Sequence, residues 1–126
     1  MAGKTSSDGV EALLAEMLRL PLYVLLREVQ APERLSELLE EHLRYMLKLE
    51  AEGHLFASGP LEHESGTMAG SLTVLRASDA TAARALADAD PFVREGVMTY
   101  ELRRWTVMEG GLQLRVSFGA GTFDLR

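Results

Sequence analysis

The chain has no cysteine, so it can form no disulfide bond and carries no thiol nucleophile. It also lacks a long hydrophobic run, because no apolar stretch approaches the roughly 20 residues that span a bilayer. The apolar stretch at residues 10–20 contains Glu11 and Glu16 and has neither the basic start nor the small-residue cleavage site of a signal peptide. The lack of a signal peptide and of a membrane-spanning run predicts a cytoplasmic protein with no membrane partner.

Basic residues are in the minority, with 13 Lys and Arg against 19 Asp and Glu, which gives a formal net charge of −6. A nucleic-acid-binding protein normally presents a basic face, whereas the arginines here are scattered among acidic residues and only Arg103 and Arg104 are adjacent. We therefore expect no nucleic-acid partner. The chain has 126 residues, of which 47% are hydrophobic, and this suits one globular domain over residues 1–126.

Hydrophobic periodicity predicts a regular order of helices and strands. The N-terminal extension over residues 1–20 is expected to hold a helix at 9–19. After it, strands are predicted over residues 22–29, 54–59, 70–77 and 97–107, helices over 31–53 and 78–90, and a polar loop over 61–70. The order strand-helix-strand-strand-helix-strand is the split βαβ arrangement of ferredoxin-like α+β folds.

The predicted sheet has more apolar surface than its own helices can cover. Two helices cover one face of a four-stranded sheet, yet the strand at 22–29 is apolar on both faces. A second copy of the chain is the simplest cover for the other face, so we expect a homodimer. Past Gly110 and Gly111, residues 112–118 alternate apolar and polar side chains, which predicts a fifth strand in the tail 110–126. We expect this strand to pair with its own sheet or with that of the partner, because an unpaired strand is an exposed edge.

One histidine lies at a position that a leucine could fill. His42 falls on the apolar stripe of the predicted long helix, one turn from both Leu39 and Met46. A buried imidazole needs a partner, so His42 is either a packed core residue bonded to a backbone carbonyl or a titrating group beside a cavity. In the second interpretation Asp90, which precedes Pro91, supplies a carboxylate that fixes the histidine tautomer. The alternative for Asp90 is an ordinary helix-ending residue before a proline.

Three features recur together in the stretches EEHLRYMLKLEAEGHLFASGP, GSLTVLRASDATAARALADADPFVREGV and YELRRW: a helix with a histidine, a strand that ends in Ser-Gly-Pro, and a helix that ends in Asp-Pro-Phe. In this combination the sequence resembles the YCII-related (YciI-like) family over residues 22–107. The resemblance implies a dimeric α+β barrel and an active-site His–Asp dyad, which corresponds to His42 and Asp90. Family members often have an arginine one turn before the histidine, where this chain has Leu39. If that arginine anchors an acidic substrate, this chain has lost the anchor or uses another cation.

Two further groups are candidates for binding a substrate. Ser58, Gly59 and Pro60 end a predicted strand, where ligands often bind, although a plain strand-ending turn has the same signature. Phe92 follows the Asp-Pro step and could line a pocket for a flat ring or simply fill the core. The same alternative holds for Tyr45, Tyr100 and Trp105.

A metal site is imaginable at His54, Glu62, His63 and Glu64. Adjacent residues of an extended chain point in opposite directions, so a solvated loop is the favoured interpretation and we expect no metal.

These observations favour a small-molecule enzyme that transfers protons with His42 and Asp90 on a hydroxylated or keto-acid-like compound, as an isomerase or a lyase. Proton transfer of this kind requires no cofactor. The resemblance supports this class, since one known activity in the family is the dehydrochlorination of a chlorinated hydroxyhydroquinone. The alternative is a non-catalytic dimeric protein that binds a metabolite or serves as an accessory to another protein.

Overall fold

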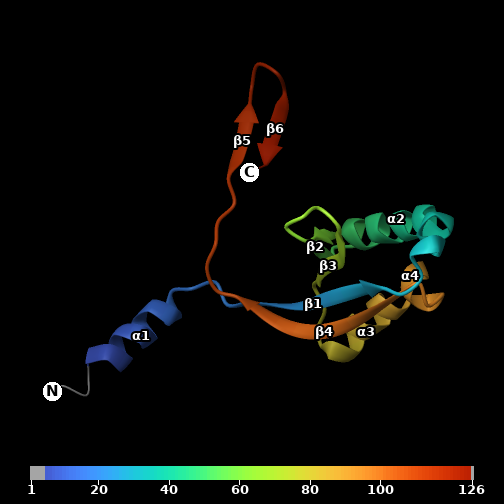
Figure 1. The fold of residues 1–126 in the computed structure, drawn as a ribbon. Coiled ribbons are helices and arrows are strands. Elements are labelled where there is room, and N and C mark those ends of the chain that lie inside the picture. The colour runs from blue at the N-terminus through green and yellow to red at the C-terminus, as the bar shows by residue number, and fades with distance from the viewer. Residues whose placement is uncertain (1–4, 126) are drawn as a thin grey trace. The chain divides into compact units, whose positions relative to one another are not determined.

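The computed structural model describes residues 5–125. Its helices are α1 (Thr5–Ala15), α2 (Leu35–Ala51), α3 (Ala80–Asp88) and α4 (Pro91–Arg94), with a 3₁₀ turn, η2, at Pro32–Arg34. Its strands are β1 (Leu20–Val29), β2 (Leu55–Glu62), β3 (Met68–Leu75), β4 (Met98–Val107), β5 (Leu114–Ser117) and β6 (Thr122–Leu125) (Figure 1). The chain groups into two compact units: residues 21–106 form one, and residues up to 20 with those from 107 onward form the other.

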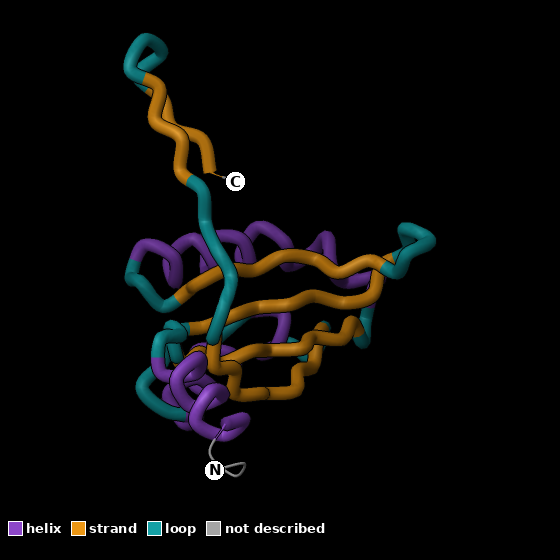
Figure 2. Tube along the Cα trace, turned by 90° about the vertical axis from the view of Figure 1, so that its left-hand side faces the viewer, coloured by secondary structure: helices purple, strands orange, loops and turns teal. Residues whose placement is uncertain are grey.

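Residues 21–106 form a four-stranded sheet with the strand order β2-β3-β1-β4 (Figure 2). β3 is antiparallel to both of its neighbours, β1 and β2. With α2 between β1 and β2, and α3 between β3 and β4, this order is that of the ferredoxin-like α+β fold, so the predicted fold class is confirmed. The register places Ser58 opposite Thr73 and Arg27 opposite Ser71. Polar side chains of three adjacent strands therefore share one face of the sheet.

Both long helices of this unit pack on that same face. Tyr23 and Leu25 of β1 point toward the helices, because alternate residues of a strand share a face. They meet α2 and α3 in one buried cluster, which comprises Tyr23, Leu25, Met46, Leu49, Leu75, Ala83 and Ala87. A second cluster joins α2 to α4 and the start of β4 through Leu38, Phe92, Val97 and Met98. The helix face is thus closed by α2, α3 and α4 together.

The opposite face of the sheet is only partly covered within one chain. Leu26, Leu61 and Trp105, which point away from the helices, are between 37% and 42% exposed. This exposed apolar surface is consistent with the expectation that both faces of the strand at 22–29 need cover. The homodimer that would cover it stays a prediction.

The loop between β2 and β3 is shorter than the sequence suggests. A polar loop over 61–70 was expected, but the ladder continues to the pair Glu62–Met68. A tight turn closes it, with the backbone N–H of His63 donating to the carbonyl of Thr67. The prediction was therefore wrong at both ends of this segment, where Leu61 and Glu62 belong to β2 and residues 68–70 belong to β3.

The long helix has the predicted end and a modified beginning. Pro32 opens a 3₁₀ turn, and the α-helix proper begins at Leu35 rather than at residue 31. Gly53 adopts a left-handed φ of 81°, and the N–H of His54 donates to the carbonyl of Leu49. This is the Schellman type of helix end, for which glycine is strongly preferred.

The other unit departs furthest from the prediction. α1 ends at Ala15 instead of residue 19, and Arg19 follows with a left-handed φ of 54°. The predicted fifth strand is present as β5, but it pairs with β6, which the sequence did not indicate. Within the described chain β5 and β6 form a separate two-stranded sheet. The prediction that the tail pairs with the four-stranded sheet of its own chain was therefore wrong. β6 is only four residues long, too short for a period to be recognised.

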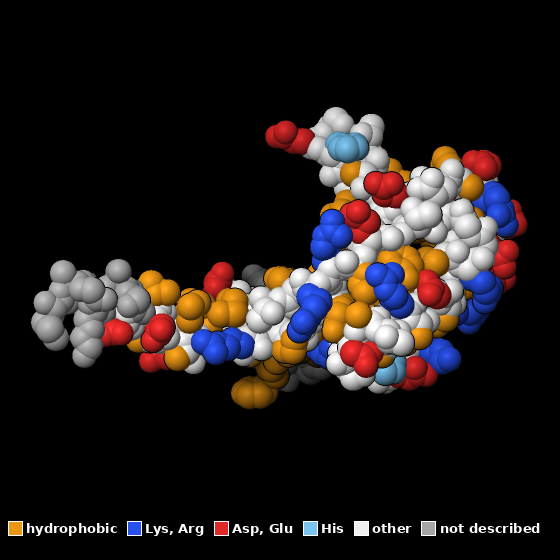
Figure 3. Space-filling view, turned by 90° about the horizontal axis from the view of Figure 1, so that it is seen from below, with side chains coloured by type: hydrophobic (Ala, Val, Ile, Leu, Met, Phe, Trp, Pro, Cys, Tyr) orange, Lys and Arg blue, Asp and Glu red, His pale blue; other side chains and the backbone are white. Residues whose placement is uncertain are grey.

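Acidic and basic side chains are intermixed on the face drawn in Figure 3. On α2, Arg44 forms an ion pair with Glu40 one turn away. No helix among the described residues is long and apolar enough to cross a membrane. The absence of a nucleic-acid partner stays a prediction.

Candidate functional site

Asp90 is both a helix cap and a fully buried carboxylate. It is the N-cap residue of α4, and its Oδ1 accepts a hydrogen bond of 2.9 Å from the backbone N–H of Phe92. Pro91 takes the first position of this helix, where its missing N–H is no loss. Asp90 is 0% exposed. The turn-forming role and the role as a histidine partner, which the sequence posed as alternatives, are thus compatible at one side chain.

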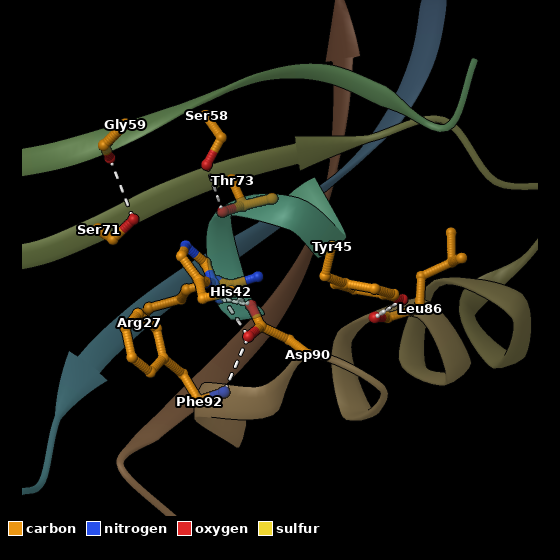
Figure 4. Close-up of polar contacts among 10 residues, drawn as sticks. All are labelled: Arg27, His42, Tyr45, Ser58, Gly59, Ser71, Thr73, Leu86, Asp90 and Phe92. Atoms are coloured by element: carbon orange, nitrogen blue, oxygen red, sulfur yellow. Dashed lines mark hydrogen bonds and ion pairs between the residues drawn. The ribbon is translucent and has the colours of Figure 1, made fainter. Parts of the chain in front are cut away.

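His42 of α2 contacts both carboxylate oxygens of Asp90. Its Nδ1 lies 3.0 Å from Oδ1 and 2.9 Å from Oδ2 (Figure 4). An ionised carboxylate can only accept hydrogen bonds, so Nδ1 carries the proton and Nε2 of the neutral ring has a free lone pair. The imidazole also stacks on Phe92, with ring centroids 4.3 Å apart and planes inclined by 23°. Two contacts therefore fix both the tautomer and the orientation of the ring.

A third residue, Arg27 of β1, completes the cluster and was not predicted. Its Nη1 donates a hydrogen bond to Oδ2 of Asp90, and its side chain is 2% exposed. A sequence signal existed, since Tyr23, Leu25 and Arg27 alternate on one face of an apolar strand. A charge on a face that is otherwise buried requires a buried counter-charge.

The pKa of Asp90 is lowered from its ordinary value of 3.8. Burial acts in the opposite direction and is the largest single influence, because it disfavours the charged form. The hydrogen bond from His42 and the positive charge of Arg27 together outweigh it. The carboxylate is therefore ionised at neutral pH although it is out of contact with solvent.

A cleft of about 480 Å³ opens beside His42, between α2 and the strands β2 and β3. Most of its lining is apolar, and the residues that line it are Leu35, Leu39, His42, Leu43, Met46, Leu47, Glu50, Leu55, Ser58, Gly59, Pro60, Met68, Gly70, Ser71, Phe92 and Met98. The structure thus brings together His42, Ser58, Gly59, Pro60 and Phe92, five of the six residues predicted for the site. Asp90 lies behind His42 and does not line the cleft.

Leu39 lies on the cleft wall and is 45% exposed. The sequence places it on the apolar stripe of the helix, and it stays exposed because the cleft leaves this part of α2 open. Leu39 itself offers no cation to this site. The cation of this site comes instead from β1, as Arg27, and it is directed to Asp90.

Hydroxyl groups occupy the strand side of the cleft. Ser58 Oγ and Thr73 Oγ1 are 2.8 Å apart, and Thr73 is buried. Ser71 donates a hydrogen bond of 3.1 Å to the carbonyl of Gly59. If Thr73 donates to Ser58, the Ser58 proton is available to a ligand in the cleft.

Among the aromatic candidates, Phe92 lines the cleft and the other three do not. Tyr45 donates to the carbonyl of Leu86, and burial raises the pKa of its hydroxyl. Tyr100 donates to Asp88, and Trp105 lies on the sheet face away from the helices. Of the two alternatives posed for these residues, lining of the cleft therefore holds for Phe92 alone.

Among residues 5–125, no three His, Asp or Glu side chains are grouped so that they could hold a metal ion. His54 lies beside Glu52 and does not line the cleft. The expectation that no metal or cofactor is used stays a prediction.

Comparison with known proteins places the chain in a family. A sequence model of the YCII-related domain matches residues 22–106. The chain belongs to the YCII-related family. The match covers the whole ferredoxin-like sheet and the cluster of Arg27, His42 and Asp90, whereas α1 and the β5–β6 hairpin lie outside it.

One solved structure with a similar fold is the 5-chloro-2-hydroxyhydroquinone dehydrochlorinase of Burkholderia phenoliruptrix AC1100, in complex with 2,5-dihydroxybenzoquinone. It aligns with a TM-score of 0.52 and 22% sequence identity, over 67% of this chain and 92% of the dehydrochlorinase. At that identity the likeness establishes the fold. No curated protein has significant sequence similarity to this chain.

Proposed function

We propose that this protein is a cofactor-independent enzyme in which His42 acts as a general base and acid on a small molecule bound in the cleft. The observation that carries the proposal is the position of His42, on the cleft wall with Nδ1 held by a buried and ionised Asp90. This arrangement presents Nε2 as the proton acceptor and stabilises the imidazolium that forms.

The chemistry that this geometry supports is an elimination or an isomerisation. Nε2 of His42 takes a proton from an acidic C–H or O–H group of the substrate. The electron pair of the broken bond forms a new double bond, and either a leaving group departs with its own electron pair or the proton returns at another atom. Ser58 donates a hydrogen bond to the substrate oxygen on which negative charge develops. The dehydrochlorinase with the similar fold catalyses a reaction of the elimination type, which supports this class by analogy of fold.

The lining of the cleft favours an uncharged hydroxylated substrate over a keto acid. The side chains that line it include no lysine or arginine, and Glu50 at its edge would repel an anion. A substrate carboxylate would lose its hydration without gaining a cationic partner. The leucines of α2 offer apolar contact to a ring or an alkyl group instead.

We further propose that the protein acts as a homodimer through the sheet face that bears Leu26, Leu61 and Trp105. These side chains form an apolar surface that the helices of the same chain do not cover. Light scattering of the wild type against Leu26→Lys tests this: the variant is expected to be monomeric and folded, and a dimeric Leu26→Lys protein would contradict this choice of face.

Turnover of chlorinated and hydroxylated hydroquinones is the direct test of the enzymatic role. His42→Asn is expected to lower kcat about 10²–10⁴-fold, as loss of a general base does, while the protein stays folded. The matched control is His54→Asn, which removes a histidine that does not line the cleft and should leave kcat unchanged.

The result that would favour the non-catalytic alternative is equally specific. A hydroquinone that binds with the same affinity to the wild type and to His42→Asn, and is turned over by neither, would indicate a metabolite-binding protein. In that case the His42–Asp90 contact would serve packing alone.

A further inference from the structure

We propose that Arg27 is a positioning residue for His42, and that it acts through Asp90 by holding this carboxylate ionised and in one orientation. The inference rests on the proposed function of His42. It assigns a role to a residue that lines no part of the cleft and was not singled out in the sequence.

Three hydrogen-bond donors surround the Asp90 carboxylate, and they do not all bond the same oxygen. Phe92 N–H donates to Oδ1, Arg27 donates to Oδ2, and His42 Nδ1 lies within 3.0 Å of both oxygens (Figure 4). The donors come from α4, β1 and α2, so the carboxylate is fixed from three elements. With Arg27 on one oxygen and the backbone on the other, the carboxylate plane cannot rotate away from the histidine ring.

The position of Arg27 is itself built into the sheet. Gly70 of β3 has a left-handed φ of 92°, and a Cβ atom there would lie 2.1 Å from the carbonyl oxygen of Arg27. The close approach of the two strands therefore requires glycine at position 70. This contact fixes the backbone from which the Arg27 side chain extends to Asp90.

Stability alone is a weak reason for an arginine at this place. A buried ion pair loses hydration on both partners, and replacing such a pair by apolar side chains is often neutral or stabilising. Nε of Arg27 is in addition buried without a hydrogen-bond partner among the described residues. Ionisation of Asp90 provides a functional reason, because a protonated carboxyl group would no longer serve only as an acceptor for the Nδ1 proton of His42.

The positive charge of Arg27 also balances part of the negative charge that Asp90 places beside His42. His42 lies beside the Asp90 carboxylate from the α3–α4 turn, with Arg27 of β1 behind that carboxylate. Tyr45 of α2 is influenced electrostatically by both of these charges, and Glu50 lines the cleft. Glu41 of α2 pairs at the surface with Arg94 of α4, 3.6 Å away. Removing Arg27 therefore leaves His42 beside a carboxylate whose charge is no longer balanced.

The test is the ¹⁵N NMR titration of the His42 ring, which needs no substrate. The variant Arg27→Met removes the charge and keeps an unbranched side chain about as long as the aliphatic part of arginine. We expect the His42 ring of this variant to give a titration curve and a tautomer distribution that differ from those of the wild type, because the cation that holds Asp90 ionised and in place is gone. Asp90→Asn, which removes the carboxylate itself, should also change both. Arg104→Met, the same substitution at an exposed site of β4, is the matched control and should leave the curve unchanged.

If Arg27→Met does not fold, the same titration is carried out on Arg27→Lys. Lysine retains the buried charge but lacks the guanidinium fork, so Asp90 is held less firmly. We expect the fraction of the neutral ring protonated at Nδ1 to fall in this variant. A folded Arg27→Met or Arg27→Lys protein with the wild-type titration curve and the wild-type tautomer would overturn the role of Arg27.

The same data separate this inference from the proposed function. If Asp90→Asn shifts the His42 curve and the Arg27 variants do not, the histidine is coupled to Asp90 and Arg27 is merely structural. If neither substitution affects His42, the proposed proton-transfer role of the pair fails as well.

Discussion

Similar apolar side chains are buried in one compact unit of this chain and exposed in the other. In residues 21–106, Leu25 and Leu75 are at most 1% exposed, whereas Leu114 of the tail is 64% and Phe118 is 96% exposed. Both units contain strands with alternating apolar residues. The difference is that helices cover the sheet of residues 21–106, whereas the described part of the tail, residues 110–125, contains only the β5–β6 hairpin. Alternation therefore predicts a strand, but burial depends on a second layer.

The largest effect is expected from breaking the buried ion pair of residues 21–106. Asp90→Ala leaves the Arg27 guanidinium buried without its counter-charge, which should lower the free energy of unfolding by about 3–5 kcal/mol. Urea denaturation followed by circular dichroism measures it. The control Asp88→Ala removes only an exposed hydrogen bond from Tyr100 near the end of α3, and should change the value by no more than about 1 kcal/mol.

A leucine-to-alanine substitution in each unit tests the difference in burial between the two units. Leu25→Ala creates a cavity in the core and should cost about 2–5 kcal/mol. Leu114→Ala removes an exposed side chain from β5 and should stay within about 0.5 kcal/mol. Equal losses in the two variants would mean that the hairpin is buried in solution, for example against a second copy of the chain.

The pH dependence of stability should also originate in residues 21–106. Because the folded-state pKa of Asp90 lies below 3.8, the folded protein binds this proton less tightly than the unfolded chain does. The stabilisation is complete above the ordinary pKa and is lost as the pH falls through the lower folded-state value. Each pH unit of difference between the two pKa values corresponds to about 1.4 kcal/mol.

Urea titrations of the wild type and of Asp90→Asn between pH 7 and pH 2.5 test this origin. The variant should lack the part of the acid-dependent decline that belongs to Asp90. Parallel curves for the two proteins over the whole range would assign the decline to other carboxylates.

The smallest effect on folding is expected from removing residues 110–126. The free energy of unfolding of residues 21–106 should change by no more than about 0.5 kcal/mol if the two units fold independently. We also expect the truncated protein to dimerise more weakly or to aggregate, as measured by light scattering against concentration. A truncated protein that stays dimeric and equally soluble would contradict a role for the tail in association. Loss of cooperative unfolding would instead support the single domain expected over residues 1–126.

Much of the site could be predicted from the sequence because its signals are local. His42 interrupts an apolar stripe, Asp90 precedes a proline, and Ser58 lies in a short Ser-Gly-Pro segment at a predicted strand end. Helical and strand periods place such residues on a face without further information. The helices α2 and α3, the four main strands and the order of these elements followed from the same periods, and this order predicted the ferredoxin-like topology.

The tertiary structure alone decided how these positions meet. Arg27 and Asp90 are 63 residues apart, so their pairing follows from packing β1 against the turn between α3 and α4 and from no local pattern. Leu39 is apolar and helical in sequence, but it faces the cleft that α2 forms with β2 and β3. The amino-acid order thus determined which side chains could share a face, whereas burial and charge pairing depended on the elements brought against that face. The physical reason is that hydrophobic burial and desolvation of charge are properties of surroundings assembled from distant segments.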